Sequence, residues 1–100
     1  MDINRSIRIA VDTGKVSYGA DSARQALLNK QAKLVILAEN APQEIKEDIN
    51  RYAEISEVPV LDFPGSSLDL GAVCGRPHFV AALTIEAMGD SDIIKAVKKK

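Results

Sequence analysis

Three short segments of the sequence combine glycine, amide and cationic side chains of the kinds that bind phosphate or a nucleobase. Gly19 and Ser22 form the first segment, Asn40 lies in the second, and the Arg-Pro-His loop Arg76–His78 is the third. A glycine lets the backbone approach a ligand, and a helix N-terminus attracts phosphate. An asparagine amide can pair with a base edge, an arginine can hold a phosphate through two hydrogen bonds, and a histidine ring can stack on an unpaired base. Each residue also has a plain structural interpretation, as a turn glycine, a helix-start residue, a surface ion pair or a loop residue.

Nucleophilic catalysis is the main alternative chemistry. Cys74 and His78 are four residues apart, so a Cys–His pair of a small hydrolase is conceivable. One cysteine and one histidine cannot supply the four ligands of a structural zinc site, and no nucleotide-binding glycine motif or phosphate-binding lysine loop is present. Because Cys74 lies among Leu70, Val73 and Gly75, a buried core residue is the better interpretation. The sequence therefore predicts no enzyme, no metal and no cofactor.

Composition and charge limit the classes of partner. The chain has 100 residues, 46% of them hydrophobic, which fits one folded domain and argues against wholesale disorder. Its 13 Lys and Arg against 14 Asp and Glu argue against a generally basic nucleic-acid-binding surface, although a local site is still compatible with them. The single cysteine, the absence of an apolar run near the ~20 residues of a membrane helix, and the polar first residues predict a cytoplasmic protein without a membrane partner. The C-terminal lysines, Lys98–Lys100, are interpreted as a solvated tail.

Turn residues divide the chain into alternating strands and helices. Lys33–Ala38 and Phe79–Ile85 are continuous apolar runs, which are typical of strands covered on both faces. Lys15–Tyr18 and Val58–Phe63 predict two further strands, and Pro59 favours an edge or an irregular position for the second of these.

Helical spacing of apolar residues predicts the segments between these strands. The resulting order, αβαβαβαβα, predicts a sheet with helices on both faces, a three-layer α/β/α sandwich. Five helices are expected. The first begins after an Asp2 cap and ends at Gly14, with an apolar face of Ile3, Ile7, Ala10 and Val11. The others follow a cap by Asp21 or Ser22, with Ala23, Ala26 and Leu27 buried; Asn40 and Pro42, with Ile45, Ile49, Tyr52 and Ala53 buried; a Ser66 or Ser67 cap, ending at Cys74 and closed by Gly75; and Gly89, with Ile93, Ile94 and Val97.

Five segments, taken in order, carry a resemblance to a known family over nearly the whole chain. Together they closely resemble the L-thirty-e family of large-subunit ribosomal proteins of archaea and eukaryotes, and the Gly-Arg-Pro-His form of the last loop resembles the archaeal members. This family belongs with the proteins that bind kink-turn RNA, a sharply bent internal loop with exposed bases. The segments are TGKVSYGADSA (13–23), KLVILAENAP (33–42), EDINRYAEISEVPV (47–60), SSLDLGAVCGRPHFVAAL (66–83) and GDSDI (89–93).

The resemblance implies a fold, a function and a set of site residues. The implied fold is an α/β/α sandwich with a four-stranded mixed sheet, forming one RNA-binding domain over residues 1–100. The implied function is that of a structural constituent of the large ribosomal subunit, monomeric off the ribosome, with kink-turn ribosomal RNA and neighbouring ribosomal proteins as partners. The residues that match the family's RNA-contacting positions are Gly19, Asn40, Lys46, Arg76, Pro77 and His78.

One position departs from the family pattern. Relatives commonly carry Lys or Arg one to three residues after the glycine, whereas Ala20 and Asp21 follow Gly19 here and the next basic residue is Arg24. A carboxylate about 4 Å from a phosphate is repelled by ~1 kcal/mol even in water. Either Asp21 caps the helix and turns away, or RNA binds more weakly than in relatives, with Lys15 and Arg24 as candidate compensating cations. The near-neutral charge also leaves open a protein-interaction module on the same scaffold.

Overall fold

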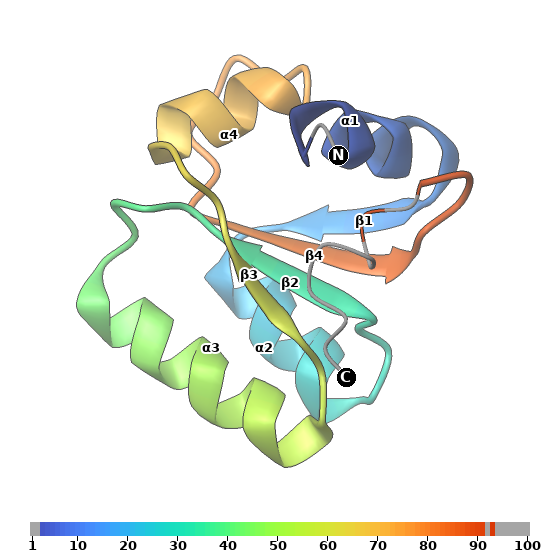
Figure 1. Cartoon of the computed structure of the whole chain (residues 1–100). Coiled ribbons are helices and arrows are strands. Elements are labelled where there is room, and N and C mark those ends of the chain that lie inside the picture. Colours follow the sequence, from blue (N-terminus) through green and yellow to red (C-terminus); the bar gives the residue numbers. More distant parts are fainter. Residues whose placement is uncertain (1–2, 92, 94–100) are drawn as a thin grey trace.

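A mixed four-stranded sheet forms the middle layer of the molecule (Figure 1). The computed structural model describes residues 3–91 and 93. Strand β4 pairs antiparallel with both β1 and β2, and β2 pairs parallel with β3, which gives the order β1-β4-β2-β3. The four-stranded mixed sheet implied by the resemblance is therefore confirmed. The strands are β1 (Lys15–Tyr18), β2 (Leu34–Leu37), β3 (Val60–Asp62) and β4 (Ala82–Ala87).

In the part of the chain that the structure describes, two helices cover each face of this sheet (Figure 1). Helices α1 (Ile3–Thr13) and α4 (Ser67–Val73) lie on one face, and α2 (Ala20–Leu28) and α3 (Gln43–Ser56) lie on the other. This arrangement confirms the predicted three-layer sandwich. Within the part of the chain that the structure describes, no helix is long and apolar enough to cross a lipid bilayer.

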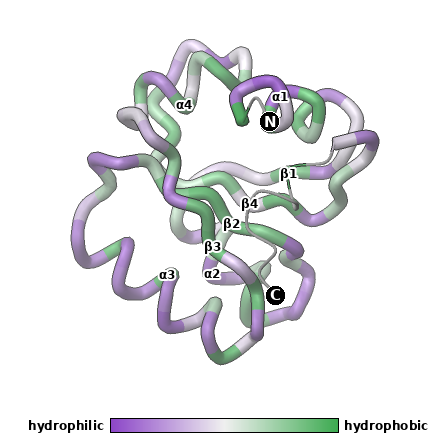
Figure 2. The backbone as a smooth tube through the Cα atoms, in the orientation of Figure 1, coloured by the Kyte–Doolittle hydropathy of each residue, from purple (hydrophilic) through white to green (hydrophobic). Residues whose placement is uncertain are grey.

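The inner strand β2 contributes side chains to two hydrophobic cores, one on each face of the sheet. Its side chains alternate between the faces, so that Leu34 and Ile36 join the core under α1 and α4, whereas Val35 and Leu37 join the core under α2 and α3. All four residues are buried, as predicted for a doubly covered strand. In Figure 2 the inner strands β2 and β4 are coloured mainly as hydrophobic, whereas α3 is mostly hydrophilic in colour.

Two strand boundaries differ from the prediction. Strand β4 begins at Ala82 rather than at Phe79, because Phe79 is 73% exposed and the N–H of Val80 bonds to the carbonyl of Ser67 at 3.0 Å instead of to a strand. Strand β3 is shorter than the predicted Val58–Phe63, but it does lie at the sheet edge, as Pro59 predicted. The apolar run 79–81 thus belongs to a loop.

The predicted cap of α2 is wrong. Neither Asp21 nor Ser22 caps α2, because the N-cap is Gly19 and no side chain bonds to the free N–H groups there. Gly19 turns the chain directly from β1 into α2, which leaves Asp21 and Ser22 inside the first turn. The predicted serine cap of α4 is correct, since Ser66 and Asp69 form a reciprocal capping box and Gly75 follows the helix with φ +77°.

Two expectations at the chain ends fall outside the described residues. The Asp2 cap of α1 and most of the helix expected after Gly89, with Ile94, Val97 and the lysine tail, belong to residues that the structure does not describe. Ile93 is described and is fully buried in the core under α1 and α4.

Candidate functional site

The strand directions bring the predicted segments to one end of the sheet. Strands β1, β2 and β3 all run opposite to β4, so their carboxyl ends meet the start of β4: Tyr18 pairs with Leu83, and Leu37 with Ala82. Gly19, Asn40 and the segment before β4 therefore lie together at this end, on the left in Figure 1. We call this surface, formed by residues 19–20, 39–41, 62–67 and 75–81, the loop end.

Backbone hydrogen bonds tie these loops to one another, although they come from distant parts of the chain. Such cross-links restrict the loops before any ligand arrives, which lowers the entropy that binding must overcome. The four bonds run from the N–H groups of Gly19, Ala38, Glu39 and Val80 to the carbonyls of Ala82 (2.9 Å), Ala81 (2.9 Å), Gly65 (2.8 Å) and Ser67 (3.0 Å), respectively.

Gly19 has a conformation that other residues rarely adopt. Its φ of +99° and ψ of 159° lie in a region essentially restricted to glycine. A Cβ atom added here would have no heavy atom of the protein within 4 Å, so the position faces open space. The backbone at the start of α2 is thus open to close approach by another molecule, next to the positive pole of the helix.

The side-chain oxygen of Asn40 is hydrogen-bonded within the protein, whereas its side-chain NH₂ group points outward. Its Oδ1 accepts a hydrogen bond of 2.7 Å from the backbone N–H of Ser67, at the start of α4. Because a backbone N–H can only donate, the oxygen must be the inward atom and Nδ2 the outward one. Asn40 is exposed, and among the described residues its Nδ2 has no hydrogen-bond acceptor. It therefore presents a fixed donor at the loop end.

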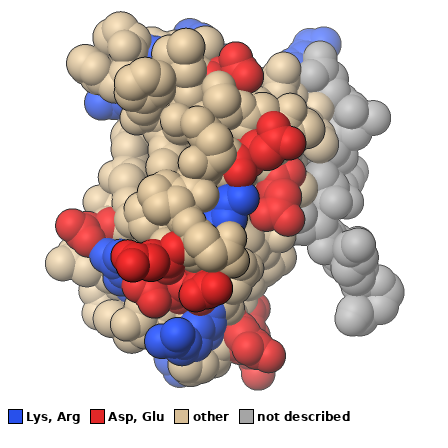
Figure 3. Space-filling model, turned by 90° about the vertical axis from the view of Figure 1, so that its left-hand side faces the viewer, with Lys and Arg blue, Asp and Glu red and all other residues tan. Residues whose placement is uncertain are grey.

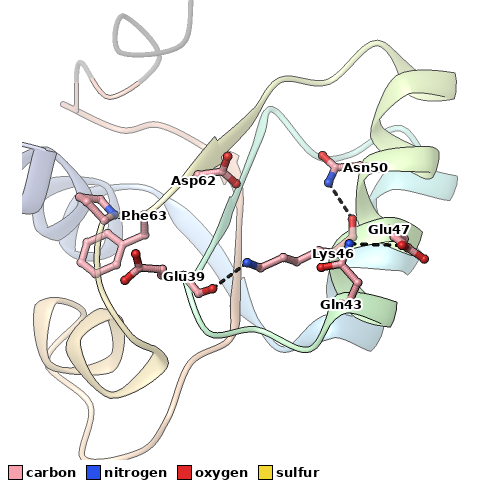
Figure 4. A pocket seen from close by; sticks show the side chains of 8 residues that line it. Glu39, Gln43, Lys46, Glu47, Asn50, Asp62 and Phe63 are labelled. Atoms are coloured by element: carbon pink, nitrogen blue, oxygen red, sulfur yellow. Dashed lines mark hydrogen bonds between the residues drawn. The ribbon is translucent and has the colours of Figure 1, made fainter.

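Lys46 lies in the first turns of α3 beside an open hollow of about 510 Å³ (Figure 4). Its Nζ donates a 2.6 Å hydrogen bond to the carbonyl of Glu39, the residue before Asn40. Glu39, Glu47 and Asp62 also line the hollow, but in Figure 4 the carboxylates of Glu39 and Glu47 point away from the ammonium. The ammonium is thus engaged with the turn after β2, in a hollow whose other charged lining residues, among those described, are acidic.

The third segment is a cationic and aromatic loop. Residues 76–79 are all exposed, and the guanidinium carbon of Arg76 lies 4.1 Å from the centre of the Tyr18 ring, a cation–π contact. Phe79 is 73% exposed, and Leu68 in the first turn of α4 is 55% exposed. Figure 3 views this end of the molecule, where uncharged side chains fill much of the upper part and charged ones gather lower down.

Tyr18 and Phe79 were missed in the sequence because both fell within predicted strands. Composition could have indicated them, because the whole chain has only four aromatic residues and two of these flank the loop segments. Ser22, by contrast, is half-buried within α2 and caps nothing.

The charges near Gly19 pair with one another. Asp21 is exposed and forms an ion pair with Arg24, whose other arm lies 3.7 Å from Asp48 on α3. Lys15 pairs with Glu86 at 3.4 Å and lies at the opposite end of β1 from Gly19. Of the two cations expected to offset Asp21, one is therefore remote and the other is already shared between two carboxylates.

Cys74 is a buried core residue, as predicted. Burial raises the pKa of its thiol from 9.0 to about 11, although the positive charges of Arg76 and Arg8 act in the opposite direction. The thiol is therefore protonated at neutral pH and unsuited to nucleophilic attack. Among the described residues, no group of three or more His, Cys, Asp or Glu side chains could hold a metal ion.

This burial predicts that the folded protein reacts slowly with a thiol reagent at pH 8 and rapidly in denaturant. Because the folded-state pKa lies above the unfolded-state value, the thiol contributes to stability below pH 9, and this contribution is lost as the pH rises toward 11. Titration with a chromogenic disulfide tests the first point, with the Cys74→Ala variant as the blank. Rapid stoichiometric reaction of the folded protein would reopen the hydrolase hypothesis.

Comparison with known proteins defines the class to which this fold and site belong. Residues 1–95 match the Ribosomal protein L7Ae/L30e/S12e/Gadd45 family, and the chain belongs to this family. The resemblance inferred from the sequence is thereby confirmed.

The individual relatives are similar over almost their full length. The chain is 50% identical over 98 residues to the large ribosomal subunit protein eL30 of Methanopyrus kandleri, covering 98% of this chain and 90% of the relative. It is also 50% identical over 95 residues to the protein of the same name from Methanosphaera stadtmanae, covering 95% and 97%. These archaeal relatives are ribosomal proteins rather than enzymes, and they support the expected cytoplasmic, ribosomal location.

A solved structure supports the fold alone. A Bacillus halodurans protein of unknown function superposes with a TM-score of 0.77 at 20% identity, covering 85% of this chain and 84% of that one.

Proposed function

We propose that this protein is a structural constituent of the large ribosomal subunit that binds kink-turn ribosomal RNA through the loop end. The large-subunit relatives, with half of their residues identical over nearly the full chain, support the assignment to that subunit. The remaining partners are neighbouring ribosomal proteins, and off the ribosome the protein is a monomer.

The observation that carries the RNA proposal is the convergence of three different contacts on one pre-formed surface. Gly19 offers open backbone at a helix start, Asn40 offers a fixed N–H donor, and Arg76 offers a guanidinium on an aromatic ring. A sharply bent RNA places phosphates and unpaired bases close together, so one compact surface can contact both kinds of group. The proposed site consists of Gly19, Ser22, Asn40, Lys46, Arg76, Pro77 and His78, with Tyr18 and Phe79 added. Ser22 lies only at its margin, and Lys46 belongs to it through its bond to the turn that carries Asn40.

Each group has a distinct role in the proposed complex. The backbone of Gly19 lies against the bent strand, and Nδ2 of Asn40 donates to a base or backbone acceptor. The exposed rings of His78 and Phe79 provide surfaces on which unpaired bases stack, while Pro77 shapes the loop. Neutral contacts of this kind suit a protein whose net charge is −1.

A binding assay with two RNAs of equal length, one kinked and one a straight duplex, tests the proposal. We expect a 1:1 complex with the kinked RNA, a preference of at least about 10²-fold over the straight duplex, and an affinity that falls as salt rises. Equal affinity for the two RNAs would refute RNA recognition by shape.

A protein-interaction module is the second candidate, favoured by the exposed Leu68 and Phe79 and by the near-neutral charge. Retention on ribosomal proteins after nuclease treatment, without binding to either RNA, would support this candidate instead.

The ion pair beside Gly19 leads to a gain-of-affinity prediction. Asp21→Asn removes a carboxylate two residues from Gly19 and frees one arm of Arg24, so we expect RNA binding about five-fold tighter, the factor that one unit charge about 4 Å away gives in water. Glu86→Gln is the matched control, because it removes one carboxylate from the pair with Lys15, at the opposite end of β1 from Gly19. An equal change in both variants would mean that only net charge matters.

A further inference from the structure

The bond between Lys46 and Glu39 reaches across seven residues of the chain. Lys46 belongs to a helix whose Ile49 and Ala53 are buried in the core, so its base is rigid. From there its Nζ contacts the carbonyl of Glu39 at 2.6 Å, along the dashed line in Figure 4. A hydrogen bond from a charged donor is stronger than one between neutral groups. Lys46 therefore connects the core of the α3 layer to the turn that carries Asn40.

Three hydrogen bonds anchor that turn to α3, to the loop before α4 and to the start of α4. Besides the Lys46 bond to its carbonyl, Glu39 donates its N–H to the carbonyl of Gly65 at 2.8 Å. Asn40 accepts from the N–H of Ser67 at 2.7 Å. The bond from Lys46 is the one that holds the peptide unit joining Glu39 to Asn40. Its loss frees the carbonyl of that unit to rotate, which shifts the Nδ2 group that Asn40 presents.

The surroundings of the ammonium are unsuited to direct contact with phosphate. Lys46 is half-buried, and among the described residues that line its hollow it is the one cation, whereas Glu39, Glu47 and Asp62 are acidic. A phosphate entering the hollow would meet a lining with net negative charge, and Lys46 would have to give up its 2.6 Å bond to reach it. Approach of RNA from this side is therefore opposed by like charge.

We propose that Lys46 is a positioning residue, which acts on RNA through Asn40 by holding the carbonyl of Glu39, and does not itself bind phosphate. This inference rests on the proposed RNA-binding function. It makes the α3 layer part of the recognition apparatus without placing it at the interface. It also predicts that the contributions of Lys46 and Asn40 to affinity are not independent.

The salt dependence of affinity separates positioning from phosphate contact. Each lysine–phosphate contact adds about 0.7–0.9 to the slope of log affinity against log salt. We expect Lys46→Met to weaken binding to the kinked RNA on the order of ten-fold, as for loss of a charged hydrogen bond, while the slope stays that of the wild type. Lys46→Arg, which can still donate to the carbonyl, is expected to restore binding. Arg51→Met is the control, because it removes one charge from the same helix away from the hollow.

Combining the variants gives a second readout. In the background of Asn40→Ala, Lys46→Met is expected to cost no further affinity, because the group that Lys46 positions is gone. Circular dichroism checks that each variant folds, and Lys46→Gln, too short to reach the carbonyl, replaces the methionine variant if that one unfolds. A slope lowered by 0.7–0.9, or additive losses in the double variant, would overturn the positioning role. Failure of the wild type to prefer kinked RNA would instead overturn the proposed function.

Discussion

Asn40→Asp is expected to abolish recognition of kinked RNA while the protein stays folded. An aspartate keeps an oxygen where Oδ1 accepts from Ser67, so the link to α4 survives. Its second oxygen replaces the outward N–H donor with a negatively charged acceptor that faces RNA oxygens. Loss of the donor and the added repulsion together predict a loss on the order of 10²-fold or more in affinity. Fluorescence anisotropy with labelled RNA measures the affinity, and thermal unfolding measures the stability.

Two companion variants locate the cause. Asn29→Asp makes the same chemical change at the C-terminal end of α2, away from the loop end, and is expected to bind like the wild type. Asn40→Ala removes both the donor and the bond to Ser67, so it is expected to lose affinity and some stability, about 1 kcal/mol for the hydrogen bond. Near-normal binding by Asn40→Asp would show that the outward amide does not face RNA.

Gly19→Ala is expected to lose stability and affinity for two separate reasons. The conformation at φ +99° strains any residue with a Cβ, which costs about 1–3 kcal/mol of folding free energy. The new methyl group meets no protein atom, so it projects into the space where RNA is proposed to pass. We therefore expect the affinity of the folded protein for RNA to fall at least ten-fold, which lies within the ~1–3 kcal/mol that one lost contact costs. Denaturant titration measures the first effect, and binding well below the unfolding temperature measures the second.

Gly89→Ala separates strain from obstruction. Gly89 also has a positive φ, but a Cβ there would collide with Thr13, next to the opposite end of the sheet. This control is expected to lose at least as much stability as Gly19→Ala and yet to bind RNA normally once folded. If Gly19→Ala loses stability but binds like the wild type, the backbone at Gly19 does not contact RNA.

The local parts of this structure were predictable because their causes are local. The apolar run over β2 and the serine cap at Ser66 can each be recognised from a few consecutive residues. Pro59 correctly indicated that its strand lies at the sheet edge. The resemblance, carried by ordered segments rather than by periodicity, then supplied the four-stranded mixed sheet, without the order of its strands. Errors arose where one residue decided a boundary, as when Gly19 replaced Asp21 or Ser22 as the cap of α2.

The parts of the site that escaped prediction depend on contacts between distant residues. Asn40 and Ser67 are 27 residues apart, so no local pattern shows which amide atom of Asn40 points outward. The contact between Arg76 and Tyr18 joins the loop before β4 to the end of β1, and it depends on the pairing of these two strands. Phe79 begins an apolar run that is typical of a strand. The N–H of the next residue, Val80, bonds to Ser67 of α4 instead of to a strand, and the Phe79 ring is exposed.

Kinked RNA is proposed to bind at the loop end and nowhere else on the described surface. Titration of isotope-labelled protein with the kinked RNA, followed by amide NMR, locates the contact surface residue by residue. We expect large shifts at Gly19, Asn40, Ser67 and residues 76–80, with little change at Lys15, Asn29 or Glu57, which lie away from the loop end. Shifts concentrated on the outer faces of α2 and α3, with the loop end unchanged, would contradict this proposal.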